Sequence, residues 1–214
     1  MPEQLTYDVV SLSATAEREV EQDMIAITFT TVQSGPDSAR VQADLITFTN
    51  EAMAVAKPKS KGNQVRVETN GMNVQPSYGK KGTIDGYIGR SSITVRGTDM
   101  QTISGLTAEI KTMSVDGIDF SVSPGLAKRT LKKLTFEAIA NFQEKALEVA
   151  TAFDAKTFKM VNVNVNSGQG RNNYRGVRAS SAMLMSASAA PTAEVEGGKE
   201  TLQASVSGTV QLVR

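Results

Sequence analysis

Seven segments of the chain alternate between apolar and polar residues, with the period of two that is typical of a half-buried β-strand. The alternation is clearest where Val161, Val163 and Val165 are separated by asparagines. Gly71 and Gly86 lie inside such segments and indicate bulges or a close backbone approach. The pattern predicts strands over residues 9–19, 24–32, 65–77, 83–97, 118–123, 158–166 and 200–213. We expect the first two strands to form an antiparallel hairpin.

Three other segments repeat their apolar residues at steps of three and four, which predicts amphipathic helices over residues 38–56, over a short stretch after Asp99, and over residues 126–153. The last is the longest. Its main apolar face carries Ala127, Leu131, Leu134, Ala138, Phe142, Ala146, Val149 and Phe153. Phe136, Ile139 and Leu147 widen this stripe, so we expect the helix to lie across a broad surface, either a sheet or a neighbouring subunit.

The order of these elements predicts an α+β fold in which helices cover one face of antiparallel sheet. From the second strand to the fifth the order is βαββαβ, which is that of the ferredoxin-like split βαβ fold. An extra N-terminal strand precedes this core, and an αββ unit with the long helix follows it. We therefore expect one domain over residues 5–214, with two lobes at 5–123 and 124–214. A long loop, residues 168–198, joins the last two strands.

Composition excludes several classes of function. The 23 Lys and Arg residues against 22 Asp and Glu give a net charge of +1, so no overall field favours nucleic acid. No apolar run is long enough for a transmembrane helix. The chain has no cysteine and no histidine, which removes disulfides, the usual zinc and haem ligands, and any Ser-His-Asp triad. We expect no enzyme activity, and no catalytic, cofactor-binding or metal-binding residue stands out.

The long loop holds the candidate interaction residues. Its first part is basic with one aromatic residue, and Arg171, Tyr174 and Arg175 could contact RNA by charge and stacking. A solvated loop is the better interpretation, because the signal is weak. Its second part is apolar around Met183, Leu184 and Met185. That part is either low-complexity chain without structure, or a segment that docks on its own sheet or on a neighbouring subunit, or a pair of redox-active methionines.

Several short segments resemble one known family in order and spacing. They are Asp23 at the first turn, residues 74–78 (VQPSY), residues 84–87 (IDGY), residues 120–123 (FSVS), residues 138–150 with the Lys145-Ala146 pair, and the closing strand at 198–212. Together they resemble the SIMPL-domain family, whose bacterial members include periplasmic or outer-membrane immunogenic proteins and oxidative-stress defence proteins. The chain departs from the family pattern at Gln22, where proline is frequent, and at residues 153–155, where the long helix commonly ends in Leu-Gly.

The resemblance implies a non-enzymatic protein of the periplasm or outer membrane, with a leader absent from this chain. It also implies a homo-oligomer linked to envelope or oxidative-stress defence, with Phe136, Ile139 and Leu147 as candidate contacts. Peripheral association with the envelope is possible, and no small-molecule substrate is indicated. The alternative is a monomeric binding module that uses the loop at 169–190 to bind a peptide, lipid or RNA partner.

Overall fold

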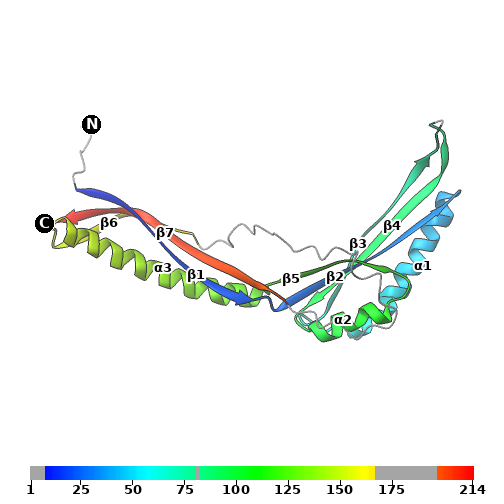
Figure 1. Ribbon diagram of the computed structural model, residues 1–214, viewed down its shortest axis with the longest axis horizontal. Helices are drawn as coiled ribbons and strands as arrows, with labels where there is room; N and C mark the ends of the chain where they lie inside the picture. The colour runs from blue at the N-terminus through cyan, green and yellow to red at the C-terminus, as the bar shows by residue number, and fades with distance from the viewer. Residues whose placement is uncertain (1–7, 81, 167–196) are drawn as a thin grey trace. The chain divides into compact units, whose positions relative to one another are not determined.

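The computed structural model describes residues 8–80, 82–166 and 197–214. The chain divides into two compact units, each built around its own antiparallel sheet. One unit contains β1, α3, β6 and β7, and the other contains the elements from β2 to β5 (Figure 1). The α+β class and the antiparallel sheets that the sequence predicts are confirmed. The predicted strands and helices are present with small changes at their ends, except that the fifth strand, predicted over 118–123, begins four residues earlier, at Ser114.

The larger unit has four strands in the order β3-β4-β2-β5. β2 and β3 are joined by α1 and lie on either side of β4, while β4 and β5 are joined by α2 and lie on either side of β2. The elements are β2 (Met24–Gly35), α1 (Ser38–Ala56), the 3-10 turn η1 (Lys57–Lys59), β3 (Arg66–Tyr78), β4 (Ile84–Gly97), α2 (Met100–Glu109) and β5 (Ser114–Ser121).

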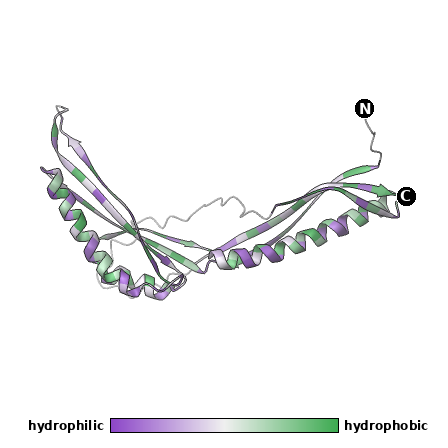
Figure 2. Ribbon diagram, turned by 180° about the vertical axis from the view of Figure 1, so that it is seen from behind, coloured by the Kyte–Doolittle hydropathy of each residue, from purple (hydrophilic) through white to green (hydrophobic). Residues whose placement is uncertain are grey.

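Alternation places the large apolar residues of β2 and β4 on the face that α1 and α2 cover. Phe29 and Ile93 on this face are completely buried, and Ile103 and Leu106 of α2 pack against them in one core. Helix α1 approaches β4 so closely at Gly89 that a Cβ there would lie 2.5 Å from the Leu45 side chain. The opposite face of the same strands carries threonine, serine and arginine. Figure 2 shows hydrophobic and more hydrophilic residues following one another along the strands.

The smaller unit has three strands in the order β1-β7-β6, with β7 in the centre. Its elements are β1 (Val9–Glu21), α3 (Pro124–Ala152), β6 (Thr157–Asn166) and β7 (Lys199–Val213). Helix α3 runs along this sheet in Figure 1 and packs mainly over β1 and β7. The helix contributes small side chains to this contact: its buried residues are Ala127, Thr130, Leu134, Ala138, Phe142, Ala146 and Ala150.

Two predictions are wrong. The first two strands do not form a hairpin, because β1 pairs along its whole length with β7, while β2 pairs with β4 and β5. Phe153, expected on the buried face of the long helix, is 60% exposed. The reason is local: the helix ends at Ala152, and Asp154 takes a left-handed conformation with φ of 56° that turns the chain away.

Candidate interaction surfaces

The residues predicted in the long loop lie outside the part of the chain that the structure describes. Arg171, Tyr174, Arg175, Met183, Leu184 and Met185 all fall within residues 167–196. The three open interpretations of that loop therefore stay predictions.

The three candidate residues on α3 are placed, and they differ in exposure. Phe136 is 64% exposed, Leu147 is 51% exposed and Ile139 is half-buried. The residues of α3 that are buried against the sheet recur at steps of three and four and form one narrow row. The sheet therefore covers only part of the wider apolar stripe on the helix.

One flank of α3 is tied to β1 by side chains. Glu137 accepts a 2.7 Å hydrogen bond from Arg18 of β1. Asn141 and Lys145 donate to backbone carbonyls of β1, at 3.0 Å to Thr15 and 2.9 Å to Ser13. Because an α-helix turns about 100° per residue, residues two positions after Glu137 and Lys145 lie on the other flank.

That other flank carries Ile139 and Leu147, on the side of the helix away from β1. Since the strand order is β1-β7-β6, this is the side of edge strand β6. Met160 and Val165 of β6 pair with Val210 and Val206 of β7, whose side chains are buried under α3. Directly paired residues share a face of the sheet, so these β6 side chains also point to the helix side.

Helix α3 nevertheless covers β6 only in part. Met160, Val163 and Val165 remain 38–46% exposed on the covered side of the sheet. Together with Ile139 and Leu147 they form an apolar surface that we call the β6 strip: Ile139, Leu147, Met160, Val163 and Val165. Bulges, charged residues and prolines protect edge strands from pairing with another strand. β6 has a bulge near Val161 and a charge at Lys159, both at its start, whereas residues 162–166 contain neither proline nor a charged residue.

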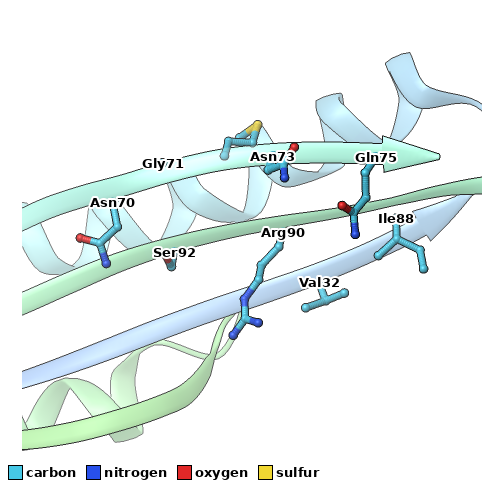
Figure 3. A pocket seen from close by; sticks show the side chains of 9 residues that line it. Val32, Asn70, Gly71, Asn73, Gln75, Ile88, Arg90 and Ser92 are labelled. Atoms are coloured by element: carbon cyan, nitrogen blue, oxygen red, sulfur yellow. The ribbon is translucent and has the colours of Figure 1, made fainter. Parts of the chain in front are cut away.

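The open face of the four-stranded sheet is a different kind of surface, because it is polar. Thr28 and Thr94 share a 3.0 Å hydrogen bond between their hydroxyls, and Asn70 donates to Thr94 at 2.8 Å. Arg90 of β4 crosses β2 to reach Asp116 of β5, where Nη2 lies 3.0 Å from both carboxylate oxygens. Figure 3 shows Arg90, Asn70 and Ser92 projecting from the same side of the sheet, with helix α1 behind the strands.

Arg90 lies between two hollows on this face and lines both. The larger has a volume of about 530 Å³ and is lined by Val32, Asn70, Gly71, Met72, Asn73, Gln75, Ile88, Arg90 and Ser92. The smaller, of about 460 Å³, is lined by Thr30, Thr31, Val32, Gln33, Arg90, Lys111, Thr112, Met113, Ser114, Val115 and Asp116.

Two local features shape these hollows. β3 has a bulge between Thr69 and Gly71, and Gly71 has φ of 131°, which residues with a side chain rarely adopt. The sequence predicts this bulge, and it is confirmed.

In the smaller hollow Thr30 is only 7% exposed, and its hydroxyl has no hydrogen-bond partner among the described residues.

The described residues offer little for catalysis. Within them, no group of three or more Asp and Glu side chains lies close enough to hold a metal ion. Asp99 has a lowered pKa, because the backbone N–H and then the hydroxyl of Thr102 donate hydrogen bonds to its carboxylate. Asp99 is the N-cap of α2, so this shift reflects helix capping.

The family model described as SIMPL, a protein of unknown function (DUF541), matches residues 10–210. The chain belongs to the SIMPL family. A search of curated proteins finds no match to it. This match confirms the family that the sequence resembles. The family is described as having an unknown function, so membership assigns no activity to this SIMPL chain. Within the described ranges, no helix of the SIMPL chain is both long enough and apolar enough to cross a membrane.

The polar site of this SIMPL protein was missed at the sequence level. Arg90, Asp116 and Thr30 come from three different strands and are ordinary residues for the solvent face of a sheet. Alternation along β4 could have assigned Arg90 to the polar face, but nothing in the sequence joins it to Asp116.

Proposed function

We propose that this SIMPL protein is a non-enzymatic, self-assembling protein of the periplasm or outer membrane that contributes to envelope or oxidative-stress defence. The observation that carries the self-assembly is the partly exposed β6 strip beside a strand edge that no described strand pairs with. The location and the link to stress rest on the resemblance to bacterial family members alone. Fractionation of the native host, with the protein found only in the cytoplasmic extract, would refute the location.

The edge of β6 is suited to pairing with another strand. Among the described residues β6 bonds only to β7, so every second N–H and C=O along it points away from this sheet. No side chain among the described residues hydrogen-bonds to its backbone. Two copies of β6 related by a two-fold axis would pair antiparallel and extend each three-stranded sheet into one of six strands.

Such pairing would also bring the two apolar strips together. Leu147 and Ile139 lie on the same flank as the β6 edge, so a second copy would remove them from water along with Val163 and Val165. Burying one exposed large aliphatic side chain contributes about 1.5–3 kcal/mol. Several such residues in one interface supply enough free energy to offset the entropic cost of association.

The non-enzymatic part is supported by the residue types. The chain has no histidine or cysteine, and the described carboxylates form no cluster. The polar face of the four-stranded sheet suits binding better than turnover, because no described hydrogen bond in either hollow joins a serine or threonine hydroxyl to a carboxylate or a lysine that could act as its base.

We also infer that the four-stranded sheet has the ferredoxin-like arrangement. The order β3-β4-β2-β5, with α1 and α2 packed into one core on one face, supports it.

Light scattering over a concentration series tests the assembly. We expect the mass to exceed that of the monomer and to rise with concentration. Val163→Lys should abolish this rise, because it puts a charge in the strip and on the strand edge. Val9→Lys is the matched control, since Val9 has the same exposure on the other edge strand. A wild-type protein that is monomeric at every concentration would refute self-assembly.

A second pair of variants locates the contact on α3. Leu147→Asp should weaken association, whereas Phe136→Asp should not, because Phe136 lies two residues beyond buried Leu134 and points away from the sheet. Both side chains are exposed, so both variants should keep their circular dichroism spectrum. The reverse result would move the interface to the outer side of the helix.

A further inference from the structure

The guanidinium of Arg90 is held in place at one nitrogen, and its other two nitrogens have no hydrogen-bond partner among the described residues. Its Nη2 donates to both carboxylate oxygens of Asp116 at 3.0 Å. A guanidinium has five N–H donors, and within the described part of the chain Nε and Nη1 make no hydrogen bond. A carboxylate that fixes one end of an arginine while the other donors remain free leaves a pre-oriented anchor for a second anion.

Thr30 adds an independent sign of an incomplete site. Its hydroxyl is buried, lines the hollow beside Arg90, and has no partner among the described residues. A buried polar group that lacks a hydrogen bond costs free energy, and native structures seldom leave one without a reason. Because Thr30 and Arg90 line the same hollow, an oxygen atom bound there is the candidate partner for both.

The charges around the two hollows favour an anionic group of low charge. The smaller hollow has Arg90 and Lys111 against the single acid Asp116, and the larger has Arg90 with no acid in its lining. A cation would be repelled by both basic groups. A phosphate group would place up to two negative charges on one group beside Asp116, whereas each carboxylate group carries a single charge.

The remaining lining indicates a small ligand with a polar body. Asn70, Asn73 and Gln75 carry amides, which both donate and accept, and Ser92 adds a hydroxyl. Neither hollow has an aromatic residue on which a base or sugar ring could stack. Volumes of about 530 and 460 Å³ match small-molecule sites.

We propose that the open face of the β3-β4-β2-β5 sheet binds the carboxylate group of a small polar molecule. Arg90 anchors the carboxylate, Thr30 donates to it, and the amides on β3 contact the body of the ligand. This site lies on the unit that does not contain the β6 strip, so it stands or falls independently of self-assembly.

Equilibrium dialysis of the full chain with radiolabelled succinate tests the proposal, because the readout does not depend on oligomeric state. We expect saturable binding at constant ionic strength that succinamide, the uncharged analogue of the same skeleton, does not displace. Absence of saturable binding, displacement by succinamide, or equally strong displacement by inorganic phosphate would each overturn the proposed carboxylate site.

Variants then assign the residues. Arg90→Gln should weaken succinate binding about ten-fold or more, as expected for loss of a charge-assisted hydrogen bond. Arg96→Gln is the matched control on the same strand, because Arg96 is paired at 2.7 Å with Glu68 and lines neither hollow. Equal losses in the two variants would show general charge attraction and overturn the site.

Thr30→Val provides a second variant should Arg90→Gln fail to fold. It keeps the shape of the side chain and removes only the hydroxyl. We expect succinate binding to weaken several-fold while the protein remains folded. Unchanged binding in Thr30→Val would overturn the role of this hydroxyl and with it the pre-formed site.

Discussion

The two edge strands of the β1-β7-β6 sheet are treated differently by the same helix. Along β1, side chains of α3 donate to the outer carbonyls of Ser13 and Thr15, and Glu137 bonds to Arg18. Along β6 no such contact exists among the described residues, and apolar side chains remain half-exposed. One edge is thus closed by the chain itself, whereas no described side chain closes the other, and the proposed self-assembly uses this second edge.

The two sheets also differ in what covers them. The four-stranded sheet is covered by two helices over large side chains such as Phe29 and Ile93, whereas α3 meets its sheet mainly through alanines, with Leu134 and Phe142 as its large buried side chains. A single helix in close contact covers a narrower band of sheet than two helices. The exposure of the β6 strip follows from this narrow coverage of the sheet by α3.

The largest effects should come from the two buried phenylalanines. Phe29→Ala and Phe142→Ala should each cost roughly 3–5 kcal/mol of unfolding free energy. We expect Phe29→Ala to cost more, because the large residues around it cannot collapse into the cavity, whereas α3 can settle on its small side chains. Urea unfolding of both variants measures the difference. A larger loss of unfolding free energy in Phe142→Ala than in Phe29→Ala would contradict the expected difference between the two cores.

The alanine row can be tested by enlarging it. Ala138→Leu should cost about 1–3 kcal/mol, because the extra volume pushes α3 off the sheet. Ala138 is completely buried, and Ala140 on the same helix is exposed. Ala140→Leu is therefore the control and should leave the urea midpoint nearly unchanged. A tolerated leucine at position 138 would show that the contact is not close.

Two threonines on one strand face give a smaller contrast. Thr28→Val loses the hydrogen bond to Thr94 and should cost about 1 kcal/mol. Thr30→Val removes a hydroxyl with no partner and should leave the ligand-free protein equally stable or slightly more stable. Thermal unfolding of both variants measures this. A marked loss for Thr30→Val would mean that the hydroxyl is already satisfied.

The smallest effect should come from the cap of α2. Thr102 lowers the pKa of Asp99 below 3.8 in the folded protein. A depressed pKa stabilises the protein at pH values above the unfolded pKa, and this stabilisation is lost as the pH falls through the folded pKa. Asp99→Ala should thus lower the thermal midpoint slightly at pH 7, and the gap from the wild type should close below about pH 4. A gap that stays constant down to pH 2 would contradict the role of the charge.

Sequence reasoning succeeded where the signal is local. Alternation and helical spacing found the strands and helices, and the buried row from Ala127 to Ala146 on α3 was predicted from the same pattern. It failed where partners are distant. Alternation in β1 shows that one of its faces is buried but not which strand lies beside it. The sequence therefore predicted that β1 pairs with β2, whereas it pairs with β7.

The candidate surfaces divide in the same way. Phe136, Ile139 and Leu147 could be singled out because excess apolar width on a helix is visible in one segment of sequence, and their role as contacts stays a prediction. Arg90, Asp116 and Thr30 were not, because each is an ordinary residue until three strands bring them together. The loop residues from Arg171 to Met185 lie outside the described ranges and stay predictions.

The pairing of β1 with β7 has a consequence for the order of events during synthesis. A nascent chain that has emerged as far as Ser121 already contains every strand and helix of the four-stranded sheet. β1 leaves the ribosome before all of them, yet its partners from Lys199 to Gln211 are made last. The first strand to appear must therefore wait, unpaired, for almost the whole of translation, and a chaperone that holds it would act on Val9–Glu21.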